Sequence, residues 1–203
     1  MRFLLISICF LVASCGSFPK KQNFQLEASV SKDIVNPYFS DKTKDYVYKA
    51  SIDVYNKHFG GLLIIKKTGN QKHRVAFTTE MGNKLFDFYF TENNFKVNYI
   101  LEDLDKKMLI NILKKDFKVL ITEKLEVSKS YSENNNRIFE TSIYKKKHYY
   151  YQNKEQLKQV FQTKNGKEKV VFLFNNISEG IVNNIEITHK NIQLKIKLKS
   201  ITQ

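Results

Sequence analysis

The sequence contains no tryptophan and very little cysteine, proline or glycine. Its 203 residues include 2 Cys, 2 Pro and 7 Gly, whereas Phe and Tyr number 16 and 11. Cys9 lies within an apolar N-terminal run, so the remainder of the chain carries only Cys15. A single cysteine cannot form an internal disulfide. The sequence therefore disfavours a disulfide-stabilised fold, thiol redox chemistry and a cysteine nucleophile.

Acidic residues are also scarce, since 34 Lys and Arg face 20 Asp and Glu and give a net charge of +14. Such a charge suggests polyanions or anionic membrane surfaces as partners. The alternative is a lysine-rich solvated exterior, which the even spread of the lysines favours. No nucleic-acid-binding motif occurs, and an N-terminal export segment argues further against a nucleic-acid partner.

Motifs of catalysis and metal binding are missing. His58, His73, His148 and His189 fall on separate predicted elements, without a second His or a Cys at metal-ligand spacing. No serine stands in a G-x-S-x-G motif, and no glycine-rich phosphate loop is present. We therefore expect no enzyme activity, no catalytic residues, no metal and no cofactor.

The N-terminus has the pattern of an export signal. Arg2 precedes an apolar run from Phe3 to Ala13 that only Ser7 interrupts. This run is shorter than the ~20 residues that span a bilayer as a helix and suits a signal peptide over residues 1–14. Val12-Ala13-Ser14-Cys15 resembles the lipobox of bacterial lipoproteins, which implies lipid attachment at Cys15. The alternative is a soluble secreted protein cleaved near the same point.

Residues 15–45 are predicted to be the lipidated cysteine and a tether, because they show no hydrophobic period and contain turn formers such as Pro19 and Pro37. Gly16 follows the cysteine, where an Asp often marks retention in the inner membrane. We expect a lipid-anchored protein of the outer membrane that faces the periplasm.

From residue 46 onward the pattern alternates with period two, as in half-buried strands. Gly60-Gly61 is expected to interrupt two of these strands, and Gly69-Asn70 and Asn165-Gly166 are hairpin signals. The predicted strands cover 48–54, 62–65, 73–79, 85–90, 95–99, 143–151, 159–163, 170–174, 185–188 and 192–198. Residues 128–136 are polar and asparagine-rich and are predicted to be a loop.

Residues 102–121 change to apolar spacings of three and four, which predicts an amphipathic helix. Glu102, Asp103 and Asp105 are expected in its first turn, where the helix dipole favours acids. The fold class is therefore mainly β with an α lid. Residues 46–203 should form one curved antiparallel sheet, a half-open barrel of roughly ten or eleven strands, with the helix on its concave face.

The order of these elements resembles the outer-membrane lipoprotein-localisation receptor family, LolB, and its periplasmic carrier relative, LolA. The closest stretch runs from His73 to Phe88, where a strand, a short loop with an apolar residue before a glycine, and a second strand follow one another. The helix at 102–121 falls where the family has a lid helix. Residues 169–172 and 185–198 resemble the last strands of the receptor. The resemblance implies a member of the type found in Bacteroidota.

This resemblance implies a receptor that binds the acyl chains of lipoproteins in an apolar cavity and inserts them into the outer membrane without nucleotide energy. Its expected partners are a periplasmic LolA-like lipoprotein carrier, the acyl chains of passenger lipoproteins, and the outer membrane through the lipid anchor. Met81, flanked by Glu80 and Gly82, occupies the position of an exposed leucine that aids membrane insertion; the alternative is that Met81 folds back as core filler. The residues expected to line the cavity are Val75, Phe77, Phe86, Phe88, Phe90, Phe95, Val97, Leu104, Met108 and Ile112.

An ordinary packed core is the alternative for those ten residues. Two other functions also fit the pattern. One is a structural or accessory envelope lipoprotein of the same fold without transfer activity. The other is an accessory factor of a hydrolase, with a site that the sequence does not reveal.

Overall fold

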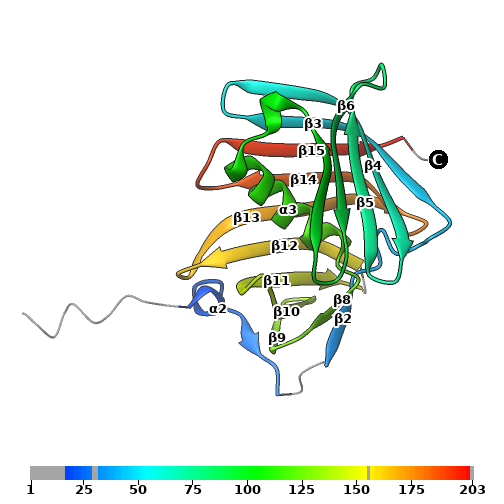
Figure 1. Ribbon diagram of the computed structural model, residues 1–203. Coiled ribbons are helices and arrows are strands. Elements are labelled where there is room, and N and C mark those ends of the chain that lie inside the picture. Colours follow the sequence, from blue (N-terminus) through cyan, green and yellow to red (C-terminus); the bar gives the residue numbers. More distant parts are fainter. Residues whose placement is uncertain (1–16, 29–31, 155, 202–203) are drawn as a thin grey trace, which may run out of the picture.

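A computed structural model describes residues 17–28, 32–154 and 156–201 (Figure 1). The predicted signal peptide and Cys15 lie outside these ranges. Within the described residues, no helix is long and apolar enough to cross a membrane.

Strands make up most of the described chain. They are β1 (Gln25–Leu26), β2 (Asp33–Val35), β3 (Asp45–Val54), β4 (Lys57–Gly69), β5 (Lys72–Thr78), β6 (Lys84–Phe90), β7 (Phe95–Ile100), β8 (Lys124–Glu126), β9 (Lys129–Glu133), β10 (Asn136–Ile143), β11 (Lys146–Asn153), β12 (Gln156–Lys164), β13 (Lys167–Ser178), β14 (Ile181–His189) and β15 (Leu194–Ser200). The helices are α2 (Phe18–Lys21), the 3-10 helix η1 (Glu102–Leu104) and α3 (Lys107–Ile121).

The main sheet has 13 strands in the described residues, in the order β1-β9-β10-β11-β12-β13-β14-β15-β3-β4-β5-β6-β7. All of its neighbouring strands are antiparallel. Because β1 and β7 are edges that do not pair with each other, the sheet stays open. Figure 1 shows it curving around α3. The predicted fold class, a half-open antiparallel barrel with a helix over its concave face, is confirmed.

Alternation places every second residue of each central strand in the core. Along β15, Leu194, Ile196 and Leu198 are buried, whereas Lys197 and Lys199 are exposed. The turn between β12 and β13 is also as expected, since Asn165 and Gly166 both adopt positive φ, at 54° and 64°.

The predicted break between two strands at Gly60-Gly61 is wrong. Both glycines lie inside β4, opposite Ser51 and Ala50 of β3. A side chain on Gly61 would collide with the carbonyl oxygen of Thr78 on β5. The glycine therefore permits a close approach of two strands rather than a turn.

The helix begins later than predicted. Residues 102–104 form η1, and α3 starts at Lys107 without an acidic residue in its first turn. The helix dipole therefore does not explain Glu102, Asp103 and Asp105. Asp103 instead accepts a hydrogen bond of 2.7 Å from Lys57 Nζ at the end of the β3–β4 hairpin.

The predicted loop at residues 128–136 is wrong, because it contains β9 and the start of β10. The consecutive residues Ser130 and Tyr131 point to opposite faces and are both buried, so each face of β9 is covered. Strand β9, together with β1 and the separation of β10 from β11, explains why the sheet has more strands than the sequence suggested.

The segment that follows Cys15 is not a free tether where the structure describes it. Phe18 of α2 and Phe24 pack on the outer face of the sheet against Tyr149, with ring centroids 4.8 Å and 6.4 Å apart. Tyr131, Ile138 and Tyr151 complete this outer-face cluster. Further along, β2 pairs with β8 in a second, two-stranded sheet, and Phe39 is buried. The folded domain therefore begins by residue 18 and not at residue 46.

Candidate functional site

Helix α3 closes the concave face of the sheet with one apolar side. Leu109, Leu113, Phe117 and Leu120 are buried, and they recur at spacings of three and four. The Phe117 ring lies 5.7 Å from that of Phe86 and 6.5 Å from that of Phe88 on β6. Helix α3, the predicted lid, therefore covers the predicted strand β6.

The ten residues expected to line an acyl-chain cavity mostly meet beneath this helix. Nine of them lie in, or pack against, one hydrophobic core: Val75, Phe77, Phe86, Phe88, Phe90, Phe95, Val97, Leu104 and Ile112. The remaining one, Met108, is 52% exposed.

The space beneath α3 is filled in this conformation. Val75, Phe77, Phe86, Phe88 and Leu104 have no solvent-accessible surface. Phe86 and Phe88 stack with their ring centroids 4.4 Å apart. An acyl chain would therefore have to displace side chains of α3 rather than enter an open hollow.

Polar contacts hold the C-terminal end of α3 in place. Lys118 Nζ donates hydrogen bonds of 3.0 Å to the carbonyl oxygens of Thr91 and Glu92 in the β6–β7 turn. Asn36 Nδ2 donates to the carbonyl oxygen of Leu120 at 2.8 Å. Burial lowers the pKa of Lys118, and the nearby charge of Glu92 opposes this shift.

A buried acid–histidine pair joins α3 to the sheet, and the sequence analysis missed it. His189 Nε2 lies 2.8 Å from Asp116 Oδ2, and both side chains are almost fully buried. Burial raises the pKa of Asp116, and the hydrogen bond from His189 opposes that rise. One signal was available, because Asp116 falls on the apolar face of the predicted helix, where an acid needs a partner.

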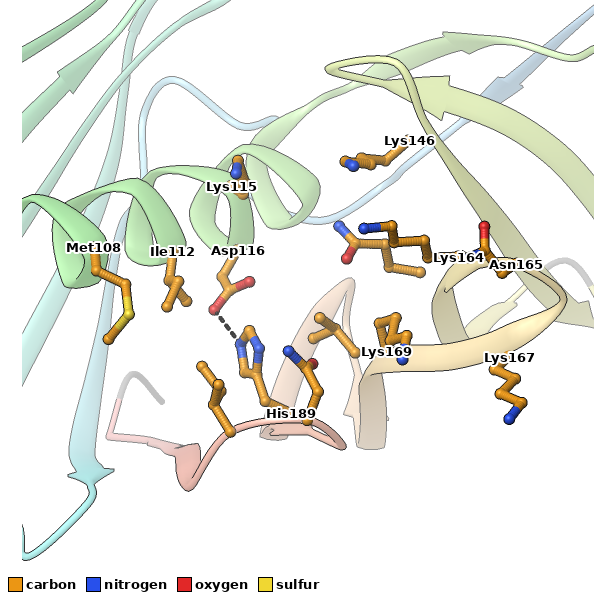
Figure 2. Close-up of a pocket in the computed structure, with 14 residues that line it drawn as sticks. Met108, Ile112, Lys115, Asp116, Lys146, Lys164, Asn165, Lys167, Lys169 and His189 are labelled. Atoms are coloured by element: carbon orange, nitrogen blue, oxygen red, sulfur yellow. Dashed lines mark hydrogen bonds and ion pairs between the residues drawn. The ribbon is translucent and has the colours of Figure 1, made fainter.

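A pocket lies beside α3 and not beneath it. It has a volume of about 610 Å³ and contains Met108 and Ile112 from the predicted cavity set. Five lysines line it together with the Asp116–His189 pair: Lys115, Lys146, Lys164, Lys167 and Lys169. Figure 2 shows the helix residues on one side of this pocket and the strand lysines on the other.

The β5–β6 loop carries the predicted membrane-insertion residue at its tip. Met81 is 93% exposed, so the alternative that it fills the core is wrong. The loop is closed by hydrogen bonds from Thr79 N–H to the Asn83 carbonyl at 2.8 Å and from Gly82 N–H to the Thr79 carbonyl at 2.9 Å. Glu80 forms an ion pair of 2.9 Å with Lys49. A fixed polar loop therefore presents one apolar side chain, whose contact with a membrane stays a prediction.

The four histidines lie on separate elements, as expected. His73 bonds to the carbonyl oxygen of Phe39 at 3.0 Å, and His58 lies 2.6 Å from Asp53. Across residues 17–28, 32–154 and 156–201, no group of three His, Cys, Asp or Glu residues could hold a metal ion.

Comparison of the whole fold gives a solved structure of similar fold. A crystal structure of a LolA superfamily protein from Nitrosomonas europaea matches with a TM-score of 0.50 and 8% sequence identity, over 82% of this chain and 88% of that one. The two chains share a fold. No protein-family model and no curated protein matches the sequence. The LolA-type fold is therefore established, whereas the receptor branch and a Bacteroidota-type member stay predictions.

Proposed function

We propose that this protein is an outer-membrane lipoprotein receptor, anchored through Cys15, that accepts acyl chains between the sheet and α3. The observation that carries the proposal is the LolA-type open sheet with a single helix covering its apolar concave face. The motif Val12-Ala13-Ser14-Cys15 supports the anchor. A periplasmic LolA-like carrier would deliver the passenger, and transfer would need no nucleotide.

Acyl-chain binding requires α3 to leave its present position, because Leu113 and Phe117 fill the space beneath it. Each methylene of an acyl chain contributes roughly 0.8 kcal/mol when buried. A long chain can therefore replace the apolar contacts of a few helix side chains. The polar contacts of Lys118, Asn36 and Asp116 then set how readily the helix moves.

Direct transfer tests this function. Residues 16–203, which retain every described element, would be mixed with a LolA-like carrier loaded with a labelled lipoprotein. We expect the label to move to this protein and then, from the full lipidated chain, into vesicles of outer-membrane lipid. A label that stays on the carrier at every ratio of the two proteins would contradict the proposal.

The Met81 loop gives a matched pair of variants for the insertion step. Met81→Glu should still accept the lipoprotein but release it into vesicles at least tenfold more slowly, because burying the native methionine contributes roughly 1.5–3 kcal/mol. Met81→Leu keeps an apolar tip and should insert at the native rate. If Met81→Glu inserts as fast as Met81→Leu, the loop has no role in insertion.

A second function rests on the filled interior. A lipid-anchored accessory lipoprotein of this fold needs no cavity, and the stacked Phe86 and Phe88 leave none in this conformation. It would neither accept a lipoprotein from the carrier nor extract lipid, and it would instead co-purify with a stable envelope protein complex.

A further inference from the structure

The pocket beside α3 concentrates positive charge. Its five lysines come from four elements or their ends: Lys115 from α3, Lys146 from β11, Lys164 from β12, and Lys167 and Lys169 from β13. Asp116 is the single acidic residue of the lining, and its carboxylate faces His189. Residues far apart in the sequence are thus gathered around one hollow (Figure 2).

The ammonium groups of these five lysines have no ion-pair or hydrogen-bond partner among the described residues. Lysines just outside the pocket differ, since Lys147 pairs with Glu140 at 2.8 Å and Lys195 with Glu186 at 2.6 Å. Unpaired like charges around a concave surface repel one another and raise the local concentration of anions. A bound anion would relieve this repulsion.

Four residues of the lining are apolar. Met108 and Ile112 of α3 line this pocket together with Val170 of β13 and Ile192 of the β14–β15 connection. Figure 2 places Met108 and Ile112 on the side away from Lys146 and Lys164. The pocket therefore has an apolar part and a cationic part, and its volume of about 610 Å³ suits a ligand of small-molecule size.

We propose that this pocket binds a phosphate-bearing amphiphile. Its phosphate would lie among Lys146, Lys164 and Lys169, where ammonium groups act as charge-assisted donors. Its apolar chain would run along Met108 and Ile112. Both halves of the lining are required, since phosphate alone leaves the apolar part wet and an uncharged chain leaves the lysines unpaired.

The position of Ser17 favours a bilayer phospholipid as the phosphate-bearing amphiphile. Ser17 lines a neighbouring pocket of about 300 Å³ that shares Lys146, Lys164 and Asn165 with the larger one. Two residues extend at most roughly 7 Å, so a lipid on Cys15 would hold this end of the protein at the membrane surface. The assignment of the ligand to the bilayer rests on the lipid anchor of the proposed function, whereas the binding site itself does not. A passenger's diacylglyceryl group carries no phosphate and does not fit the cationic half.

Soluble probes test the site without any anchor or transfer. Binding to residues 16–203 would be measured by calorimetry with dihexanoyl phosphatidylglycerol, dihexanoyl phosphatidylcholine, dihexanoylglycerol and inorganic phosphate. We expect the phosphatidylglycerol to bind at least tenfold more tightly than each of the other three. The triple variant Lys146→Glu/Lys164→Glu/Lys169→Glu should weaken that binding at least tenfold.

A matched variant controls for net charge. Lys42, Lys72 and Lys96 are exposed and lie outside the pocket, and their joint replacement by Glu changes the charge by the same amount. It should weaken binding less than threefold. Equal losses in the two triple variants, or equal binding of phosphatidylcholine, would overturn the proposal. Equally tight binding of inorganic phosphate would leave a bare anion site and would also overturn it. Failure of lipoprotein transfer with intact phosphatidylglycerol binding would reject the proposed receptor function alone.

Discussion

The two faces of the sheet can be compared on one strand, β11, because its successive side chains point to opposite faces. The faces differ in how their buried polar groups are hydrogen-bonded. On the inner face, beneath α3, Tyr150 and His148 are buried; the Tyr150 hydroxyl and His148 Nε2 have no hydrogen-bond partner among the described residues. On the outer face, Tyr149 donates a hydrogen bond of 3.0 Å to Glu140. At β11, the inner face therefore holds a neutral imidazole and a neutral hydroxyl, because burial lowers the pKa of His148 and raises that of Tyr150. The outer face instead holds a charged, hydrogen-bonded carboxylate.

Their covers differ as well. The inner face is covered by α3, a 15-residue helix with a broad apolar side. The outer face at β9–β12 is covered by Phe18 of the four-residue helix α2 and by Phe24, just before β1. The larger, drier contact should determine whether the whole domain is folded, and the smaller one should open separately.

The largest effect is expected from the inner cover. Phe117→Ala removes a fully buried ring that contacts Phe86 and Phe88 and should lower the free energy of unfolding by about 3–5 kcal/mol. Urea denaturation would measure this loss. A loss below about 1 kcal/mol would show that α3 contributes little to the stability of the domain.

Acid should reveal the second effect, through His148. Burial lowers the pKa of His148 to about 4, from an ordinary value of 6.5. Between these values the unfolded chain binds a proton that the folded chain does not, so stability falls as the pH falls. The contribution lost between pH 7 and pH 4 is about 3 kcal/mol. His148→Phe should show a correspondingly smaller loss over this range in unfolding experiments, and an unchanged pH dependence would contradict the assignment.

A smaller and local effect is expected from the outer cover. Phe18→Ala should cost only about 1–2 kcal/mol, because the segment around α2 can detach while the sheet stays folded. Hydrogen exchange should then accelerate in residues 17–28 and in β9, which accepts a hydrogen bond from Glu27 N–H at the Ser130 carbonyl. Acceleration throughout β12–β15 would instead show that the outer cover and the core unfold together.

The smallest effect compares neighbouring tyrosines. Burial would raise the pKa of Glu140, but hydrogen bonds from Lys147, Tyr149 and Tyr131 outweigh it and lower that pKa. Tyr149→Phe removes one of these bonds and should cost about 1 kcal/mol. Tyr150→Phe removes an unpartnered hydroxyl and should be neutral or slightly stabilising. Equal losses in the two variants would contradict the difference between the faces.

Local patterns predicted most of the sheet. Alternation in β3, β5, β6 and β15 and the Asn165-Gly166 turn depend on neighbouring residues only, and the structure has them where the sequence placed them. The outer-face cluster was missed because Phe18 and Phe24 are isolated in a polar segment. Their partners on β11 lie more than 100 residues away, and alternation carries no information about such distant contacts.

The candidate site was harder to predict for the same reason. The exposure of Met81 followed from its place between Glu80 and Gly82 in a short loop. The Asp116–His189 pair, by contrast, joins residues 73 positions apart. The lysines of the pocket come from α3 and three different strands, so their even spacing in the sequence concealed how they gather in space.

The short strand β1 also decides where the sheet ends. Gln25 and Leu26 pair with Ser132 and Tyr131, so that backbone groups at the free edge of β9 are hydrogen-bonded. If this segment were pulled away, β9 would present unpaired N–H and C=O groups that another chain could extend. A stretch of a few residues near the N-terminus thus shields the edge of β9, and its loss by proteolysis should leave that edge open to pairing with a strand of another chain.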